Sequence, residues 1–279
     1  MSASRQGRVD DDREVPVPGG REPEVLLVGG TANRGRVVRI GNTVRRPLRP
    51  TSPATHALLR HLEDVGFPGA PRVLGIDDEG REVLSFVPGT AVTRPCPAWA
   101  LTDDALVSVA ALLRDYHRAV GSFDPSPYDW PASPPAPFAG HLVSHNDVNL
   151  DNVVFRGGRA VALIDFDLAS PGSRVWDVGG AVRLWAPLRP DRDVDDARRG
   201  RVLARLRLFV DSYGLSDADR DDLVSAVRHN HEWSYDIVDT AAANGHAAFT
   251  EYWAVARGRA ERARQWYVDR ADQLREALG

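Results

Sequence analysis

Three short apolar segments, and the polar residues between them, limit the possible folds of this chain more than any other stretch. Residues 142–144 and 153–155 have the composition of buried strands, and a polar loop of eight residues separates them. A Gly157-Gly158 turn then leads into a third apolar segment, which ends at Asp165. A hairpin of the second and third segments would bring Asn152 close to Asp165, although thirteen positions separate them. The stretch therefore predicts a cluster of oxygen-bearing side chains at one end of a hairpin.

The loop at 145–152 carries the residue types that phosphoryl transfer needs. Such a reaction depends mainly on positioning and on neutralising the charge of the transferred group. It needs a carboxylate near the accepting hydroxyl, and Asp147 is the candidate for this role. It also needs oxygen ligands for magnesium, which keeps waters and phosphate oxygens as its remaining ligands. Asn152 and Asp165 are the candidate metal ligands, so these residues predict a Mg²⁺-dependent transfer.

The same residues carry a resemblance to a known family. His145, Asp147 and Asn152 match the H-x-D-x-x-x-x-N loop of aminoglycoside phosphotransferases and choline-kinase-like enzymes. The segment Asp165-Phe166-Asp167 stands where that family and the protein kinases have a metal-binding D-x-D or D-F-G segment. The resemblance extends over approximately residues 24–270 and implies a two-lobed, protein-kinase-like fold.

The resemblance also implies roles for two supporting residues. His145 is expected to pack beneath the loop as a structural residue rather than to act as an acid or base. Asp177, in Trp176-Asp177-Val178-Gly179, looks like the aspartate at a helix start that holds the family's catalytic loop through backbone hydrogen bonds.

Apolar patterning divides the chain into a strand-rich first part and a helical second part. Residues 1–22 lack apolar periodicity and are expected to form a flexible N-terminal segment. Residues 23–89 are expected to form a nucleotide-binding N-lobe, and residues 90–279 a C-lobe with the catalytic loop and the acceptor-binding helices. The predicted fold class is α+β, with a small antiparallel-sheet N-lobe, a larger helical C-lobe and a cleft near Pro88. C-lobe helices are expected at 176–186, 192–213, 216–244 and 247–277.

The nucleotide-binding end departs from the usual kinase pattern. The turn Gly29-Gly30-Thr31 could cover phosphates with backbone N–H groups, and an ordinary hairpin turn is the alternative. The third strand should carry a lysine for the phosphates, but the sequence contains no lysine, so Arg45 is the candidate by position. Strand alternation is expected to turn Arg46 to the opposite face. Thr55 and His56 occupy the helix positions where the family's glutamate partner is expected.

The last strand of the N-lobe ends in Ser85, Phe86 and Val87, just before Pro88-Gly89. This is where the family's hinge binds the purine through backbone groups. Backbone recognition does not depend on side-chain type, so this segment does not distinguish ATP from GTP. The expected co-substrate is therefore ATP or GTP, and the expected cofactor is Mg²⁺.

Acceptor binding is expected on the C-terminal helices. Glu232, Trp233 and Asp236 bring acidic and aromatic side chains together within two helical turns, and Asp167 is added from the loop segment. Carboxylates beside flat rings would suit a cationic amino sugar or a basic peptide antibiotic. Two alternatives stay open: the helix acids form a solvated face with the aromatic residues in the core, or Asp167 contacts the metal.

Composition excludes several classes of protein. The net charge of −4 argues against a general nucleic-acid-binding protein, and the single cysteine, Cys96, excludes a disulfide framework. No run reaches the roughly 20 apolar residues of a membrane span, and the N-terminus lacks a secretory signal. A cytoplasmic monomer or homodimer with a small-molecule acceptor is expected, without nucleic-acid or membrane partners.

Together these observations predict a kinase that transfers the γ-phosphoryl group of ATP or GTP to a hydroxyl of an aminoglycoside-like or other antibiotic. Such an enzyme would confer antibiotic resistance. The first alternative is a metabolic kinase for an amino alcohol or a sugar, because the family includes both kinds. The second is a nucleotide-binding module without turnover, which the missing lysine and glutamate suggest and the complete set of Asp147, Asn152 and Asp165 opposes.

Overall fold

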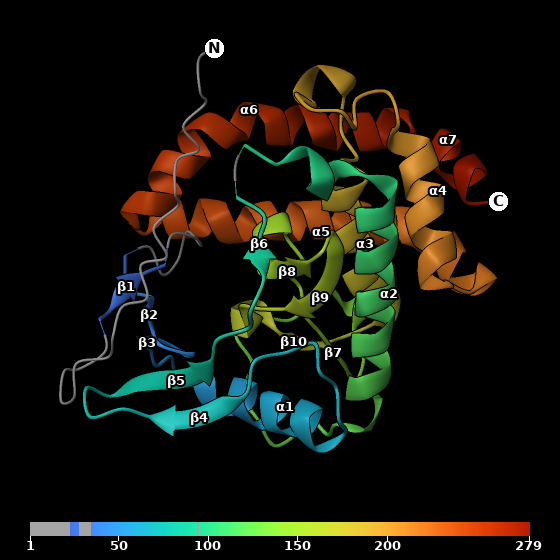
Figure 1. Ribbon diagram of the computed structural model, residues 1–279. Coiled ribbons are helices and arrows are strands. Elements are labelled where there is room, and N and C mark those ends of the chain that lie inside the picture. Colours follow the sequence, from blue (N-terminus) through green and yellow to red (C-terminus); the bar gives the residue numbers. More distant parts are fainter. Residues whose placement is uncertain (1–22, 28–34, 94) are drawn as a thin grey trace, which may run out of the picture.

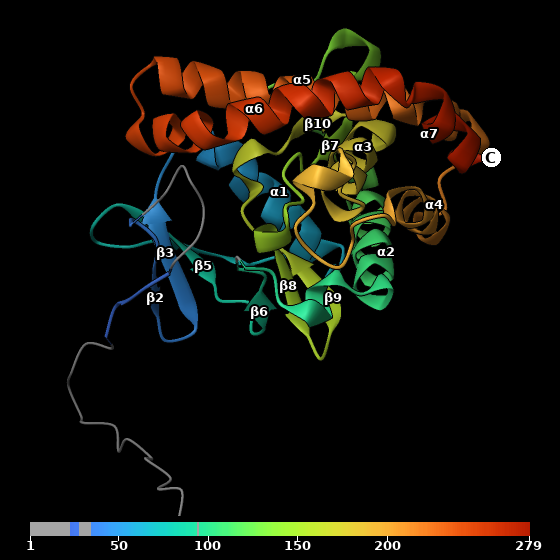
Figure 2. The same ribbon diagram turned by 90° about the horizontal axis from the view of Figure 1, so that it is seen from above.

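The computed structural model describes residues 23–27, 35–93 and 95–279. The N-terminal part of this region is a five-stranded antiparallel sheet with the strand order β1-β2-β3-β5-β4. One helix, α1, lies between this sheet and the strands of the C-terminal part (Figure 2). The elements are β1 (Val25–Leu26), β2 (Val38–Ile40), β3 (Thr43–Pro47), α1 (Ser52–Asp64), β4 (Val73–Ile76) and β5 (Arg81–Ser85).

The α1 helix packs because its apolar residues recur at helical spacing. Leu58, Leu59 and Leu62 are almost completely buried, and Leu84 of β5 belongs to the same core. The helix ends before Gly66, which has the positive φ of 74° that glycine tolerates best. The sheet and its helix are thus joined to one apolar core that continues into the C-terminal part.

The C-terminal part contains two small sheets close to the predicted loop. The strand β6 (Thr90–Ala91) pairs with β8 (Val153–Arg156), which pairs with β9 (Arg159–Leu163). The strand β7 (Leu142–Ser144) pairs with β10 (Ser170–Gly172). The predicted hairpin is therefore present. The boundary between the lobes, expected between residues 89 and 90, stays a prediction. Directly after this position the chain forms β6, which pairs with β8.

Helices make up most of the C-terminal part. In Figure 1, α5 and α6 run side by side across the top of the molecule, and α2 runs steeply beside α3. Trp176 and Trp185 of α3 are fully buried in the central core. The helices are α2 (Asp103–Ala119), α3 (Arg174–Trp185), α4 (Val202–Tyr213), α5 (Asp217–Ala243), α6 (Ala247–Asp269) and α7 (Ala271–Leu278). Short 3₁₀ turns are η1 (Ala98–Leu101), η2 (Val120–Ser122), η3 (Ala136–Phe138), η4 (Leu150–Asn152), η5 (Phe166–Leu168) and η6 (Asp191–Asp193).

The α+β, two-lobed, kinase-like fold predicted from the sequence is confirmed, but two helix boundaries were wrong. The helix expected at 192–213 begins only at Val202, because Asp196 accepts from the backbone N–H of Arg198 in a turn that buries the arginine. The helix expected at 247–277 is divided at Arg270 into α6 and α7. None of the helices in the described part of the chain combines the length and apolar character needed to span a membrane.

Candidate active site

One buried carboxylate holds the start of the loop at 145–152. Asp177, in the first turn of α3, accepts hydrogen bonds from the backbone N–H groups of His145 (2.8 Å) and Asn146 (2.9 Å). It also accepts from Nε2 of His117 at 2.9 Å. Burial alone would raise the pKa of Asp177, but these hydrogen bonds hold that pKa below its usual value. The loop is therefore fixed to α3 by an ionised carboxylate.

His145 lies beneath the loop and is completely buried. Its Nε2 bonds the carbonyl oxygen of Ile164 at 3.1 Å, and its Nδ1 accepts from the backbone N–H of Asp147 at 3.3 Å. These contacts fix the neutral tautomer with the proton on Nε2. Burial lowers the pKa of His145 to about 4, which keeps the ring neutral at physiological pH. The ring thus joins the loop to the end of β9, as a supporting residue would.

Asn146 is a structural residue that sequence reasoning missed. It has a positive φ of 64°, a conformation that asparagine adopts more readily than most other residues. Its Nδ2 donates to the carbonyl oxygen of Leu168 (2.8 Å) and to Oγ of Ser170 (2.7 Å), while its Oδ1 accepts from Nε1 of Trp176 (2.8 Å). A buried side chain with this many partners holds the strained backbone in place. The signal was available, because asparagine is one of the few residue types suited to such a turn.

Asp147 follows at the surface of the loop and is half-buried. Nδ2 of Asn152 donates to its Oδ2 at 2.8 Å, and Nδ2 of Asn149 donates to its Oδ1. Burial, with the nearby charges of Asp165 and Asp151, raises the pKa of Asp147 to about 8. The carboxylate is therefore oriented by two amides and is more basic than an exposed aspartate.

The hairpin brings Asn152 and Asp165 together, as the spacing predicts. The backbone N–H of Ile164 donates to the carbonyl oxygen of Asn152 at 2.9 Å, directly before Asp165. Asp165 has a φ of 63°, a strained conformation for a non-glycine residue. Burial and the charge of Asp167 raise the pKa of Asp165 to about 6 in the absence of a metal. The strain and the shifted pKa both mark this turn as a candidate functional position.

The side chains of Asn152 and Asp165 fit a magnesium ion. Nδ2 of Asn152 donates to the carbonyl oxygen and to the carboxylate of Asp147, so its Oδ1 faces away from Asp147 and is available as a ligand. Asp165 supplies carboxylate oxygens on a partly exposed side chain. Among the described residues there is no group of three or more His, Cys, Asp or Glu that could hold a metal. An ion with few protein ligands, completed by waters and phosphate oxygens, is the pattern that magnesium prefers.

A buried arginine faces this carboxylate cluster from the N-lobe. Nε of Arg46 donates to Oε1 of Glu82 at 2.6 Å, and its Nη1 lies 3.0 Å from Asp165 and 2.9 Å from Asp167. The other carboxylate oxygen of Glu82 bonds Nε2 of His56 at 2.7 Å. Glu82 is 1% exposed, so the hydrogen-bonded side chains of His56, Glu82 and Arg46 are shielded from solvent on the N-lobe side. The acidic partner of the strand β3 cation thus comes from β5, and α1 contributes a histidine instead of a glutamate.

The predicted orientation of the two neighbouring arginines is therefore wrong. Arg45 lies on the other face of β3, where its Nε is 3.5 Å from Asp77. The register of β3 with β5 places Arg46 opposite Glu82, and strand alternation puts Val44 on the same face. Val44 was the available signal, since an apolar residue marks the core-facing side of a strand and the second residue after it shares that side.

The remaining predicted nucleotide contacts are only partly accessible. The backbone N–H of Ser85 donates to the carbonyl oxygen of Arg72, and that of Phe86 donates to Asn42, both within the N-lobe. These two N–H groups are therefore already paired within the N-lobe. The predicted phosphate-covering turn lies outside the described residues, with all three of its members, Gly29, Gly30 and Thr31.

The predicted acceptor residues are separated by the structure. Asp167 lies on the donor side, paired with Arg46 and with Arg49 (2.8 Å). Glu232 on α5 faces α6, where Nε of Arg264 lies 3.5 Å from it. Trp233 packs edge-on against the buried Trp176 and donates to the carbonyl oxygen of Ser133, whereas Asp236 is exposed. Most of this group therefore has structural partners, and it does not form one acidic pocket.

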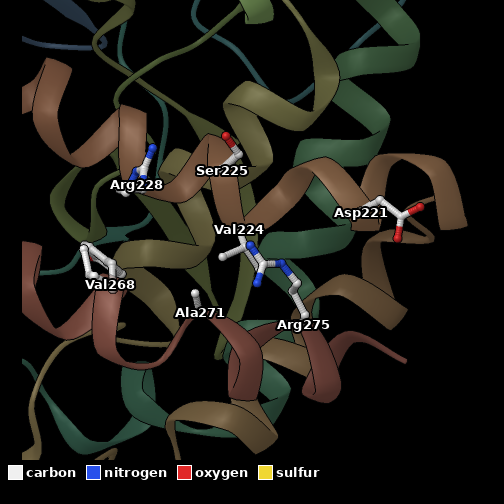
Figure 3. Close-up of a pocket in the computed structure, with 8 residues that line it drawn as sticks. Asp221, Val224, Ser225, Arg228, Val268, Ala271 and Arg275 are labelled. Carbon is white, nitrogen blue, oxygen red and sulfur yellow. The ribbon is translucent and has the colours of Figure 1, made fainter.

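Two cavities in the described region lie apart from the loop. One, of about 230 Å³, is enclosed by α5, α6 and α7 and contains none of the predicted site residues (Figure 3). Arg228 and Arg275 line it together with apolar side chains such as Val224. The other, of about 520 Å³, lies on the outer face of the N-lobe sheet beside Arg45 and Asp77. Neither cavity includes a residue of the catalytic loop.

The α3 carboxylate, the β8–β9 hairpin and the buried N-lobe arginine bring the loop, Asp165 and β3 together. The fold, with the family match that follows, makes the protein a two-lobed, kinase-like phosphotransferase. The model of the "Phosphotransferase enzyme family" matches residues 14–140 and 128–209, so the chain belongs to that family. Members of this family are phosphotransferases.

A curated relative is the trifolitoxin immunity protein of Rhizobium leguminosarum bv. trifolii. It is 33% identical over 271 residues, which cover 91% of this chain and 98% of the relative. Among solved structures, a choline/ethanolamine kinase family protein from Mesorhizobium loti aligns with a TM-score of 0.62 and 17% identity over 94% of each chain. An aminoglycoside 2'-phosphotransferase of type IIIa, solved with GDP, aligns with a TM-score of 0.55 and 14% identity over 93% of this chain and 92% of its own. These two likenesses support the kinase-like fold.

Proposed function

We propose that this enzyme transfers the γ-phosphoryl group of ATP or GTP to a hydroxyl of an antibiotic. One observation carries the proposal. Asp177 holds the start of the loop through the backbone N–H of His145. Within the loop, Oδ2 of Asp147 accepts from Nδ2 of Asn152 at 2.8 Å. The carbonyl oxygen of Asn152 accepts in turn from the backbone N–H of Ile164, the residue before Asp165. This grouping supports Asp147 as the base and Asn152 and Asp165 as metal ligands, because phosphoryl transfer needs a base close to two oxygen ligands for magnesium.

Asp147 would orient the accepting hydroxyl and receive its proton. The hydroxyl oxygen forms a bond to the γ-phosphorus, the bond between the γ-phosphorus and the bridging oxygen breaks, and the nucleoside diphosphate leaves. The raised pKa of Asp147, about 8, supports the role because a proton acceptor works best when its pKa lies near the working pH. Mg²⁺, held by Asn152 and Asp165, would supply neutralisation of the phosphate charge.

Arg46 would hold the donor phosphates in place of the missing lysine. Its guanidinium is the N-lobe cation that reaches the metal-ligand carboxylate, and Glu82 fixes its orientation through Nε. Arginine presents a planar fork with fixed donor directions, so its orientation matters more than that of a lysine ammonium. His56, which bonds the second oxygen of Glu82, would keep that carboxylate in position.

An antibiotic acceptor is favoured by one relative. The similarity to a protein named for immunity to trifolitoxin covers nearly the whole length of both chains, which supports a protective role against a toxic small molecule or peptide. A protective kinase would act by adding a charged phosphoryl group to a hydroxyl of such a compound.

The test is nucleotide consumption by the purified enzyme with a panel of hydroxylated compounds. The panel contains aminoglycosides, peptide antibiotics, amino alcohols and sugars, and products are identified by mass. We expect at least one antibiotic to gain a phosphoryl group, and Asp147→Asn to lower that turnover by about 10²–10⁴. Asp129→Asn, a substitution of an exposed aspartate outside the loop, is the matched control and should have little effect.

Each other outcome has a defined meaning. Phosphorylation of an amino alcohol or sugar alone would identify a metabolic kinase. Binding of Mg-nucleotide without any consumption across the panel would identify a nucleotide-binding module. Full turnover by Asp147→Asn would show that the assignment of the base is wrong.

A further inference from the structure

A carboxylate of η5 joins two arginines of the N-terminal part. Oδ1 of Asp167 lies 2.9 Å from Nη1 of Arg46, and its Oδ2 lies 2.8 Å from Nη2 of Arg49. The side chain of Asp167 is only 12% exposed, so water and salt screen these ion pairs less than pairs at the surface. Because each of its oxygens already faces a guanidinium, the geometry of Asp167 favours a role toward the arginines over a role as a metal ligand.

The arginine nitrogen that contacts Asp167 also contacts the candidate metal ligand. Nη1 of Arg46 lies 3.0 Å from Oδ1 of Asp165 and 2.9 Å from Oδ1 of Asp167, so these two oxygens are at most about 6 Å apart. When Asp165 binds Mg²⁺, its carboxylate is shared between two cations, and the contacts of Arg46 with Asp167 and Glu82 remain. Glu82 holds Nε and Asp167 holds Nη1, which together set the plane and the direction of the guanidinium.

The negative charge of Asp167 disfavours phosphate binding unless another group balances it. So close to the candidate metal ligand, an unpaired carboxylate would repel the phosphates of a nucleotide. Arg49 supplies the balancing charge, and its backbone is fixed by the start of α1. The backbone N–H of Arg49 donates to Oγ of Ser52 at 3.0 Å, and the backbone N–H of Ser52 donates to the carbonyl oxygen of Arg49 at 3.0 Å.

We propose that Asp167 is a positioning residue that directs Arg46 toward the donor phosphates, and that Arg49 cancels the charge of Asp167. The proposal rests on the proposed function, because it concerns the phosphate-binding cation of that same reaction. A carboxylate from η5 then makes the direct contact with this cation that the helix positions of Thr55 and His56 do not provide.

The experiment is a double-mutant cycle on Arg49 and Asp167, in which calorimetry gives the dissociation constant of Mg-ATP. Arg49→Gln leaves an unbalanced carboxylate and should weaken binding by about tenfold, which is less than the interaction of two unit charges about 4 Å apart near a protein surface. Arg49→Gln combined with Asp167→Asn removes both charges and should bind about threefold or more tightly than Arg49→Gln alone. Arg49→Lys keeps the charge and should stay within about threefold of the wild-type protein.

A second comparison isolates the positioning by Asp167. Asp167→Asn and Asp167→Ala both remove the charge, but only asparagine keeps an oxygen that can accept from Arg46. Asp167→Ala should therefore bind Mg-ATP about threefold or more weakly than Asp167→Asn. Arg60→Gln removes an exposed arginine of α1 and is the matched control, which should leave the affinity unchanged. Chemical unfolding of each nucleotide-free variant measures any loss of stability separately.

The inference would be overturned if Arg49→Gln bound Mg-ATP like the wild-type protein, or if the double variant bound no more tightly than Arg49→Gln. A pair with a purely structural role gives that second result. Equal affinities of the two Asp167 variants would also overturn it, and this comparison decides the matter if Arg49→Gln does not fold. Transfer is assayed separately with the compound panel. A protein that shows the expected affinities but consumes no nucleotide would refute the proposed function and support the positioning by Asp167.

Discussion

The donor-phosphate grip can be tested by exchanging the N-lobe arginine for lysine, the residue that kinases of this fold usually carry. Arg46→Lys keeps a positive charge but loses the fork that donates to Glu82 and to Asp165 at once. A lysine held by Glu82 cannot also present a second donor to a phosphate, so one charge-assisted hydrogen bond to the nucleotide is lost, and such a bond is worth about 1.5–3 kcal/mol. We therefore expect the affinity for Mg-nucleotide to fall by about tenfold or more.

The assay is calorimetric titration of Mg-ATP and Mg-GTP into the variant, combined with chemical unfolding. Arg45→Lys is the matched control, because Arg45 is on the opposite face of the same strand, where it donates to Oγ1 of Thr43 and lies 3.5 Å from Asp77. Partly exposed pairs of this kind contribute about 0–1 kcal/mol, so nucleotide binding should change by less than a factor of about five. Unfolding of both variants shows whether any loss of affinity follows from a loss of stability.

The reasoning would be refuted if Arg45→Lys weakened nucleotide binding more than Arg46→Lys did. That outcome would mean that the outer face of β3 binds the donor. Equal and near-wild-type affinity in both variants would show that neither arginine contacts the phosphates.

Three further predictions follow from the site. Asp165→Ala should weaken Mg-nucleotide binding more than Asn152→Ala, because a charged ligand is lost in place of a neutral one; calorimetry gives the order, and equal wild-type affinities would contradict the metal site. Asn146→Ala should lower turnover and cost about 1–3 kcal/mol of stability, measured by unfolding, because alanine lacks the hydrogen bonds that hold the positive φ; an unchanged stability would contradict this. Burial lowers the pKa of His231 in the folded protein to about 3. The same side chain in the unfolded chain has a pKa of about 6.5, so below that pH the unfolded state binds a proton that the folded state does not. Stability should therefore decrease by up to about 1.4 kcal/mol for each pH unit below that value, and denaturation of His231→Asn should show a weaker dependence on pH.

The features that sequence could predict depend on short stretches of chain. Strand, loop and hairpin follow one another between residues 142 and 165, so the connection itself brings Asn152 near Asp165. Asp177 lies twelve positions after Asp165, at a helix start, and the family resemblance, not local order, predicted that it would hold the loop. Local order was enough to predict the hairpin and, with the lobe pattern, the two-part fold.

The features that sequence could not predict depend on contacts between distant segments. Glu82 lies 36 positions from Arg46, and the pair forms only because β3 and β5 are neighbours in a particular register. The exchange of Arg45 and Arg46 in the prediction is different, because Val44 marks the core-facing side of β3 within the sequence itself, and a shift by one residue exchanges the two faces of a strand.

Arg46 has carboxylate partners before any nucleotide binds. It donates to Glu82 through Nε and lies within ion-pair distance of Asp165 and Asp167 through Nη1. A phosphate at Nη1 would exchange one of the last two contacts for its own, while the contact with Glu82 would stay and hold the guanidinium in place. The affinity measured for Arg46→Lys is consequently a difference between two sets of contacts, and unfolding of the nucleotide-free variant measures the first set separately.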